Sequence, residues 1–454
     1  MAMLLRIGLL RRSKISGPSR WATLRGLVPV PFRRFPGFLS AMTARYGNLF
    51  AFALPWRSYV FVNEPALVKD MLVTQQHAFS KSLGTRVLRL LLGEGLLTSE
   101  DPLHRQMRRI VQPAFHRDRI EEYARIMERG AAEFRDRLVP GEPFDAHAAM
   151  TALTLRIATE TLFGSDESGA ASAVADALRL MMTEFPAMLT PIGALRQRLP
   201  LRNTRRFWRA RNMLDAIIYG LIGRQRGDAR QRTDALSMLL ASQRAEGDAR
   251  VGDEQIRDEI MTLFMAGHET TANALTWGLY LLAQHPAVDE RAAAAARRGD
   301  SQHVMRVVKE VLRLYPPAWI IGRETVRDVT LVDGSFIAQG TTVFAAPLLL
   351  HRRADYFDDP QSFNPDRWLG PDPAPFSYVP FGGGARRCIG EEFALRETAI
   401  VLSALLARYR FELQPGARVE IAPLVTLRPA GPVPMRAMER PASLRAKVNV
   451  GSSI

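Results

Sequence analysis

The sequence predicts one large, mainly α-helical domain with small β-sheets. Long patterns of apolar residues at helical spacing occupy residues 101–230, 253–285 and 300–315, whereas alternating runs typical of strands are short and lie within 47–75, 325–345 and 412–437. No internal repeat or linker divides the 454 residues. Because 47% of the residues are hydrophobic and 24% are charged, the chain can bury one extensive core.

The N-terminal region is expected to be irregular before it reaches the first strands. Residues 1–40 are rich in Arg, Pro and Gly and predict an arm outside the domain. Residues 47–75 then predict a hairpin followed by a helix that begins at Pro65, since proline is favoured in the first turn of a helix. We place the domain at residues 41–437 and a frayed tail at 438–454.

The longest helix pattern runs from Asp253 to His285, starts with acidic residues and is followed by Pro286. At 1.5 Å per residue, such a helix is about 50 Å long and crosses the whole domain. A second helix is predicted over residues 300–315, where two prolines end it, and another follows Cys388.

Composition and charge exclude some classes of partner. The net charge of +15 predicts attraction to acidic partners or anionic surfaces. Nucleic acid is not the expected partner, because the chain has no zinc pattern, helix-turn-helix signature or aromatic-basic RNA motif. It also has no run of about 18 uncharged apolar residues, so no transmembrane anchor is expected.

The N-terminus and the cysteine content bear on the location of the protein. Residues 1–12 are apolar but interrupted by Arg6, and two interpretations stay open: weak contact with a membrane surface, or packing onto the body of the protein. The single cysteine allows no intramolecular disulfide and fits a reducing compartment. We therefore expect a soluble, monomeric, cytoplasmic protein.

That single cysteine, Cys388, lies in the glycine-rich segment 381–390. One interpretation is a buried structural thiol next to a turn. The other is a thiolate bound to iron, which is favoured by the basic residues Arg386 and Arg387 and by the N-terminus of the following helix. The glycines would let the backbone pass close to a flat cofactor and turn its amides toward the sulfur. The full pattern Phe-x-x-Gly-x-Arg-x-Cys-x-Gly, which starts at Phe381, resembles the haem-binding signature of the cytochrome P450 family.

A second motif, Ala266-Gly267-His268-Glu269-Thr270, lies in the middle of the longest predicted helix. Taken alone, it also fits a packing glycine followed by a solvated glutamate. It is similar to the central-helix motif of the P450 family. The resemblance implies that Ala266 and Gly267 leave room beside the haem. It also implies two catalytic residues: Thr270, which steadies the bound dioxygen and its water, and Glu269, which helps to relay protons.

A third set of residues carries a structural role. Glu310 and Arg313 lie three residues apart and share one helix face. Such a pair is usually solvated and of little energetic value. Here it resembles the Glu-x-x-Arg pair of the P450 family, and Arg367, within residues 363–368, resembles the arginine of the family's meander. The resemblance implies that the three side chains form a buried network that locks the loop near Cys388.

Haem carries two propionates, which need cationic partners, and arginine suits carboxylates best. Each candidate cation alone would be taken for a surface charge. The resemblance to the family assigns the propionate contacts to His104, Arg108, Arg323 and Arg386. The remaining residues expected to bind the cofactor are Phe381, Gly267, Ala266 and Cys388, the last of which is also the metal ligand.

The resemblance extends from about residue 40 to 435, and the departures are modest: Asp366 and Trp368 replace the more usual Glu and Phe of the meander. It implies the cytochrome P450 fold around a buried haem b, and a monooxygenase that uses O2 to hydroxylate or epoxidise a lipophilic small molecule. No flavin or iron–sulfur region is recognised, so electrons are expected from an acidic ferredoxin or flavodoxin with its NAD(P)H reductase. Its expected docking face is basic and includes Arg105, Arg109, Arg117 and Arg387.

Apolar residues predict the chemistry of the substrate. The expected pocket residues are Phe185, Phe264, Ala318, Trp319 and Ile320, which favour a fatty acid, terpenoid or steroid-like molecule. Phe185 belongs to a Met- and Phe-rich segment that fits ordinary core equally well. Two alternatives are a peroxide-driven haem-thiolate peroxygenase and a non-catalytic haem-binding sensor. The acid–alcohol pair argues against the first, and the retained threonine and central glycine argue against the second.

Overall fold

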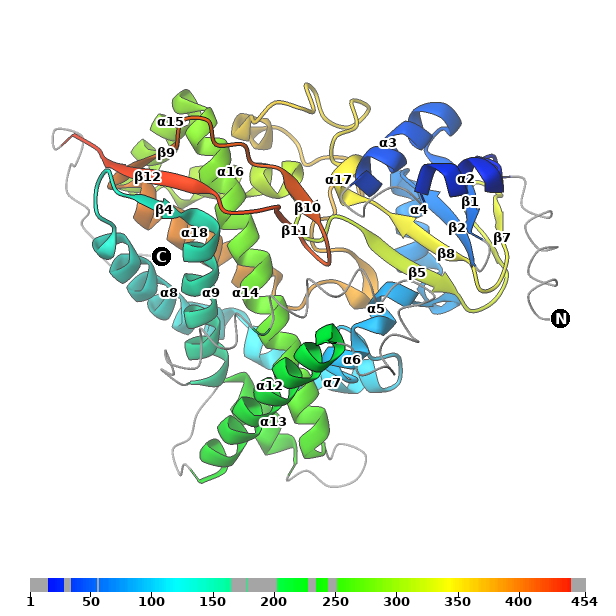
Figure 1. Cartoon of the computed structure of the whole chain (residues 1–454), viewed down its shortest axis with the longest axis horizontal. Helices are drawn as coiled ribbons and strands as arrows, with labels where there is room; N and C mark the ends of the chain where they lie inside the picture. The colour runs from blue at the N-terminus through cyan, green and yellow to red at the C-terminus, as the bar shows by residue number, and fades with distance from the viewer. Residues whose placement is uncertain are drawn as a thin grey trace.

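A long central helix organises the structure, a computed structural model in which most helices gather around α14 and the main sheet lies to one side (Figure 1). The predicted mainly helical architecture with small sheets is confirmed. The structure describes residues 15–27, 34–54, 57–164, 177, 202–227, 234–243 and 251–441.

Helix α14, Asp253–Gln284, has 32 residues and runs through the middle of the helical region (Figure 1). It is buried along most of its length, as expected for a helix that is apolar on several faces. Trp277, near its C-terminal end, stacks on Tyr315 with ring centroids 4.2 Å apart. The helix predicted for this part of the chain is confirmed.

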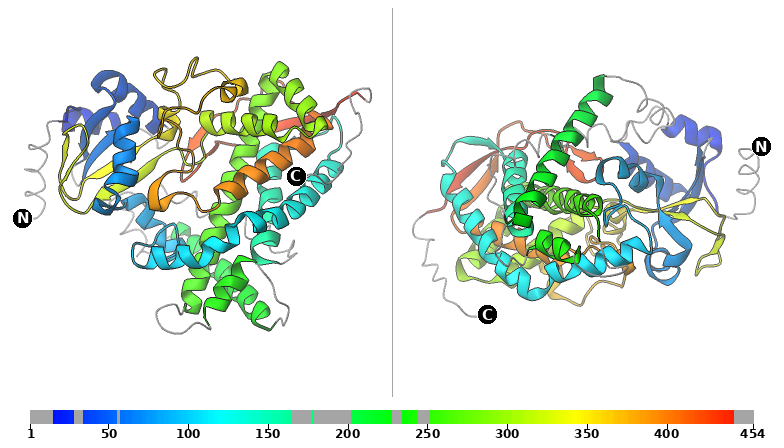
Figure 2. Two further views of the ribbon diagram at one scale, coloured as in Figure 1. Left: turned by 180° about the vertical axis from the view of Figure 1, so that it is seen from behind. Right: turned by 90° about the horizontal axis from the view of Figure 1, so that it is seen from below.

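Helices on both sides of α14 form the core. Helix α18 lies beside α14 and also packs on α8 and α16, as the view from behind shows (Figure 2). A second group of helices surrounds the N-terminal half of α14, where Leu214, Ile256 and Ile260 share one apolar cluster. The helices and their bounds are α5 Leu83–Val87, α6 Arg89–Leu92, α7 Leu103–Val111, α8 Arg117–Arg137, α9 Ala146–Phe163, α12 Arg202–Gly227, α13 Ala235–Ser242, α15 Pro286–Arg298, α16 Ser301–Leu314, α17 Pro347–Leu350 and α18 Glu391–Leu406.

The main sheet has the strand order β1-β2-β8-β5-β3. Its strands are β1 Leu49–Leu54, β2 Arg57–Val62, β3 Phe79–Lys81, β5 Ile321–Thr325 and β8 Thr342–Ala345. Strands β2 and β8 are parallel, and the other neighbours are antiparallel. In the pairing of β3 with β5, Lys81 lies opposite Arg323, so the sheet brings two cations side by side. The predicted hairpin is confirmed, and it is followed by helix α4, Pro65–Lys69.

Three smaller sheets account for the remaining strand patterns. Strands β4-β12-β9 form one sheet, and β10-β11 and β6-β7 form two hairpins. Gly334 has φ of 82°, a conformation that favours glycine, in the turn between β6 and β7. The bounds are β4 Pro143–Asp145, β6 Val329–Thr330, β7 Phe336–Ile337, β9 Tyr409–Leu413, β10 Ile421–Pro423, β11 Leu427–Pro429 and β12 Pro434–Glu439.

The expectation of an irregular arm over residues 1–40 is wrong where the structure describes it. Helix α2 spans Arg20–Leu27, and α3 spans Phe35–Tyr46. Pro36, in the first turn of α3, suits a helix start, and Leu39 is buried against the aromatic side chains of the β1–β2 hairpin. Apolar packing therefore stabilises a helix here, although the Arg- and Pro-rich composition favours irregular structure.

The C-terminal boundary also differs from the expectation. Strand β12 extends to Glu439, and the buried Arg440 forms ion pairs with Asp289 and Glu290, so packed residues continue past the predicted end at 437. The Met- and Phe-rich segment 181–200 lies outside the described residues. Among the helices that the structure describes, none is long and apolar enough to cross a membrane.

Candidate functional site

The cysteine loop leads directly into α18. Its glycines Gly382 and Gly384 have φ of 71° and 68°, and a Cβ at Gly384 would lie 1.9 Å from the carbonyl oxygen of Leu72, so only glycine fits there. The Cys388 N–H donates to the carbonyl of Phe381 at 3.0 Å and closes the loop. Cys388 is thereby held three residues before the first residue of α18.

The Cys388 side chain combines accessible surface with a raised pKa. Burial raises the pKa of its thiol, and the amide of Gly390 and the charges of Arg108 and Arg387 oppose that shift by smaller amounts. The cationic residues and the nearby amide lower the thiol pKa, as expected, but desolvation raises it by more. Since the side chain is nevertheless accessible, the sulfur faces a space within the protein. A metal ion that binds there would supply the missing stabilisation of the thiolate.

The middle of α14 also carries an accessible residue. Ala266 is exposed although the preceding residues of the helix are buried, so open space adjoins it inside the fold. Thr270 lies one turn further on the same face and is half-buried. A Cβ at Gly267 would instead meet Leu162 and Ala158 of α9, at 3.6 and 3.8 Å. Of the Ala-Gly pair, Ala266 is therefore the residue that faces the space.

The two expected catalytic side chains make different contacts. The Thr270 hydroxyl donates to the carbonyl of Ala266 at 2.7 Å, one turn earlier. Glu269 is half-buried, and its Oε1 accepts a hydrogen bond of 2.7 Å from the Thr426 hydroxyl. Thr426 belongs to the turn between β10 and β11, so the acid contacts a segment far away in the sequence.

Cations from three elements gather near the cysteine loop. Burial, followed by the charge of Arg386, lowers the pKa of Arg323 to about 10. Burial lowers the pKa of Lys81 well below its usual value, and Arg323 and Arg386 add to the shift. The pKa of His104 falls to about 4, first through burial and then through Arg386, so its imidazole is neutral at pH 7. Arg108 on α7 donates to the carbonyl of Arg387 at 2.8 Å.

The acidic groups near this cluster do not neutralise its positive charge. Arg386 donates to Glu100 and to the carbonyl of Ser99, both at 2.7 Å, and Asp101 lies 3.8 Å from Arg386. The Arg323 guanidinium donates to a backbone carbonyl at 3.0 Å. Buried cations that repel one another would be stabilised by an anion.

These residues fit a haem. The group carries an iron for the accessible Cys388 sulfur and two carboxylates for the cation cluster, and its flat ring would suit the small, exposed Ala266 of α14. The structure places Arg108 against the cysteine loop, and His104 and Arg323 close to Arg386 of the same loop. It adds Lys81, which the sequence analysis missed because its place opposite Arg323 depends on sheet pairing.

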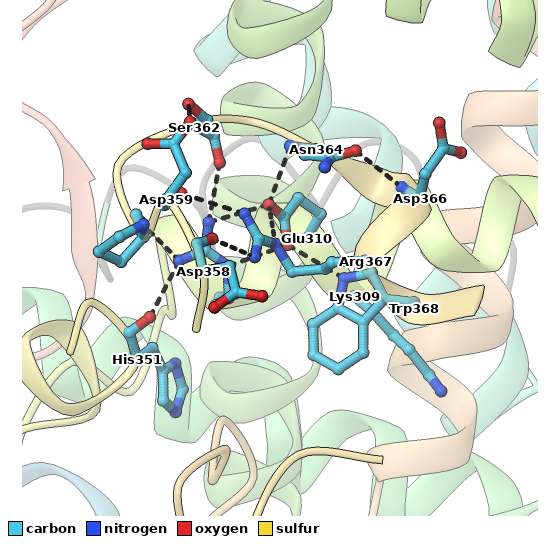
Figure 3. A network of polar contacts seen from close by, with 12 residues as sticks. Lys309, Glu310, His351, Asp358, Asp359, Ser362, Asn364, Asp366, Arg367 and Trp368 are labelled. Atoms are coloured by element: carbon cyan, nitrogen blue, oxygen red, sulfur yellow. Dashed lines mark hydrogen bonds and ion pairs between the residues drawn. The ribbon is translucent and has the colours of Figure 1, made fainter. Parts of the chain in front are cut away.

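The predicted charge network is buried and fully formed (Figure 3). Glu310 accepts from Arg313 at 2.8 and 2.9 Å and from Arg367 at 3.0 Å. The Trp368 indole N–H and the Asn364 backbone N–H also donate to it, each at 3.0 Å. The substitution of Trp for the more usual Phe thus adds one donor to the network.

Arg313 extends the network to the loop that follows α17. Its guanidinium donates to the carbonyls of His351, Pro360 and Ser362, at 2.9, 2.7 and 2.9 Å (Figure 3). Arg367 donates to the carbonyl of Asp359 at 3.1 Å. Backbone groups of the long loop are therefore tied to one helix face, which is a structural rather than a chemical role.

The predicted pocket residues differ in how much of their surface is exposed. Ala318 is exposed between buried neighbours, and Ile320 is half-buried. Phe264 is buried in the cluster around the N-terminal half of α14. Trp319 is fully buried, and its indole N–H donates to the carbonyl of Leu424 at 3.0 Å, so it supports the β10–β11 hairpin. Phe381 packs against the main core, and Phe185 lies outside the described residues.

Comparison with known proteins identifies relatives of this chain. The family model described as cytochrome P450 matches residues 17–431. Cyclooctatin synthase of Streptomyces melanosporofaciens is 36% identical over 88% of this chain and 90% of its own length. Cyclooctat-9-en-7-ol 5-monooxygenase of the same organism is 33% identical, over 87% and 88% of the two chains. Pentalenene oxygenase of Streptomyces avermitilis is 33% identical, over 89% and 94%.

Proposed function

Because this chain belongs to the cytochrome P450 family and is a cytochrome P450 monooxygenase, we propose that it inserts one oxygen atom from O2 into a lipophilic small molecule of the terpenoid class. The observation that carries the proposal is the pairing of an accessible Cys388 in the glycine-rich loop with an exposed Ala266 and a half-buried Thr270 in the middle of α14. A cysteine that would bind the iron and an alcohol that would hold a water molecule are groups that suit oxygen activation by a haem.

Several residues would hold the cofactor, which we propose is haem b. The Cys388 sulfur would bind its iron, and Arg323, Arg108, Arg386 and His104 would contact the two propionates. When bound, the haem supplies the chemistry that side chains lack, because its iron can activate O2 for insertion into a C–H or C=C bond. The network around Glu310 holds the loop after α17 through the carbonyls of His351, Pro360 and Ser362, and would thereby support the cysteine loop that follows it in the chain.

The protein's own contribution to the reaction is the handling of protons. The Thr270 hydroxyl lies on the face of α14 that adjoins the open space and would hold a water molecule there. The neighbouring Glu269 carboxylate can accept and donate a proton and would pass protons to the water held by Thr270. Buried apolar side chains such as Phe264 would exclude other water from the site.

The lining and the relatives together favour a terpenoid. Ala318 and Ile320 offer apolar surface, and Val425 of the β10–β11 turn packs against the apolar cluster that contains Phe264. Two relatives at 33% identity are named for the oxidation of pentalenene and cyclooctat-9-en-7-ol. Both observations support a compact hydrocarbon skeleton rather than a polar substrate.

Electrons are proposed to come from an acidic ferredoxin or flavodoxin. Arg109 and Arg117 are exposed and would attract such a partner. Arg387 contributes less, because Glu391 pairs with it at 2.6 Å, and Arg105 lies 3.4 Å from Asp101. The basic face is thus smaller than the sequence alone suggested.

An optical titration of the purified ferric holoprotein tests the substrate class. Terpenes including pentalenene, fatty acids and steroids would be added while the Soret band is followed, with an azole as the control that reports an accessible iron. We expect a high-spin shift with terpenes, and product formation when a ferredoxin and its reductase are added. A shift with fatty acids or steroids alone would contradict the terpenoid assignment. No turnover of any lipophile would contradict the proposed activity.

A further inference from the structure

Glu269 lies at the end of a chain of hydrogen-bonded polar side chains. The other three members of this chain do not belong to the expected acid–alcohol pair. The Thr426 hydroxyl contacts Glu269 Oε1 at 2.7 Å, Asn273 Nδ2 contacts Thr426 Oγ1 at 3.1 Å, and His147 Nε2 contacts Asn273 Oδ1 at 3.2 Å. The four residues come from α14, from the β10–β11 turn and from the first turn of α9. Thr426 and Asn273 are both buried.

The hydrogen bonds of this chain run in one direction. Asn273 donates through its Nδ2, so its Oδ1 must accept from His147 Nε2–H. Burial lowers the pKa of His147, and the contact with Asn273 opposes the shift, so the ring is a neutral imidazole with its proton on Nε2. The Thr426 hydroxyl oxygen accepts a hydrogen bond from Asn273, and the hydroxyl proton of Thr426 is donated to Glu269.

The turn that carries Thr426 is fixed on several sides. The Trp277 indole N–H donates to the carbonyl of Leu427 at 3.0 Å, and the Leu427 N–H donates to the carbonyl of Pro317 at 2.9 Å. Trp319 donates to the carbonyl of Leu424, also at 3.0 Å. Because the residues on both sides of Thr426 are held, its hydroxyl is a rigid reference point for the Glu269 side chain.

We propose that Thr426, supported by Asn273 and His147, is a positioning residue for Glu269. It fixes Oε1 as an acceptor and leaves Oε2 as the oxygen that exchanges protons. The chain orients the carboxylate and does not conduct protons, because the amide of Asn273 would have to tautomerise to pass one on. This inference rests on the proposed role of Glu269 as a proton relay.

Matched variants separate positioning from packing. Thr426→Val keeps the shape of the side chain and removes the hydroxyl, whereas Thr426→Ser keeps the hydroxyl. Thr276→Val is the control, because this buried α14 threonine donates to the carbonyl of Ala272 at 2.7 Å, two turns from Glu269. The measurement is product formed per reductant consumed, with the terpene that gives the largest Soret shift.

We expect Thr426→Val to lower the product yield roughly tenfold, the loss that follows from one hydrogen bond to a charged group. Peroxide should rise in proportion, while KM and the substrate-induced Soret shift stay unchanged. Thr426→Ser should restore the yield, and Thr276→Val should behave like the parent protein. Unchanged coupling in Thr426→Val, or equal losses in both valine variants, would overturn the proposal.

A crystal structure of the Thr426→Val holoprotein provides a readout that needs no substrate. We expect the Glu269 carboxylate to leave the position that it occupies in the parent protein. If Glu269 stays in place, Thr426 does not position it, whatever the turnover. If no terpene is oxidised but Glu269 moves in the variant, the proposed substrate class fails and the positioning role stands.

Discussion

Glu310 and Arg313 lie three residues apart on α16, both side chains are fully buried, and two hydrogen bonds of 2.8 and 2.9 Å join them. Arg367 adds a third charge to the same carboxylate at 3.0 Å. A buried ion pair is stabilising only when its remaining donors and acceptors are satisfied. Backbone carbonyls from the loop after α17 satisfy them here, so loop shape and charge balance depend on each other.

Replacing Glu310 by Gln should be severely destabilising. The substitution leaves the fully buried Arg313 and the half-buried Arg367 without this counter-charge, and breaking a buried pair in this way costs about 3–5 kcal/mol. Chemical denaturation of the holoprotein, together with the rate of haem loss, measures the effect. The matched control is Glu439→Gln, which removes an exposed partner of Arg408 at 3.2 Å and should cost under about 1 kcal/mol. Similar losses in the two variants would contradict the network's structural role.

Replacing Arg323 by Met should have opposite effects on the two forms of the protein. Without haem, the variant should be at least as stable as the parent, because burial and Arg386 already disfavour the Arg323 charge. With haem, it should release the cofactor faster to an acceptor protein, because a propionate partner is lost. Thermal denaturation of both forms and a haem-transfer assay distinguish these effects. Equal haem retention in variant and parent would argue against the propionate contact.

The sequence predicted helices and charge pairs correctly where the local pattern of residues alone determines them. The long helix over α14 follows from apolar residues at helical spacing, and the charge pair of α16 follows from its three-residue interval. The irregular arm failed because composition alone ignores packing: Leu39 of α3 is buried against the aromatic residues of the first hairpin. Burial by distant partners cannot be derived from a local stretch of sequence.

The parts of the site that were missed depend on tertiary contact. Lys81 joins the cation cluster only through the register of β3 against β5. Thr426 reaches Glu269 from a turn more than 150 residues away, and nothing in its local sequence indicates that contact. The raised pKa of Cys388 was also missed, because the sequence displays nearby charges but not the desolvation that outweighs them.

Replacing Thr270 by Ala should uncouple the reaction. The variant loses the hydroxyl on the open face of α14, so reductant should be consumed with more peroxide and less product. Thr270→Ser should recover most of the coupling, since it keeps the hydroxyl. A peroxide-driven enzyme or a haem sensor would show no such change, and an unaffected ratio of product to reductant would therefore speak against the proposed function.

Glu397 should make stability depend on pH. Burial raises the pKa of this α18 carboxyl well above its ordinary value of 4.5, and the Thr271 hydroxyl opposes the shift by less. The folded state keeps the proton while the unfolded state releases it, so stability should decline as pH rises above about 4.5. Glu397→Gln removes this dependence. Denaturation at several pH values should show a variant that matches the parent at pH 4 and exceeds it at pH 8.

The central claim, that the Cys388 sulfur is the axial ligand of a haem, is tested most directly by the Soret band of the reduced, carbon monoxide-bound holoprotein. Thiolate ligation moves this band to a longer wavelength than histidine ligation does. We predict the long-wavelength band for the parent protein and its loss in Cys388→His, with haem still bound. A parent protein that lacks the band, or a Cys388→His variant that retains it, would contradict the account.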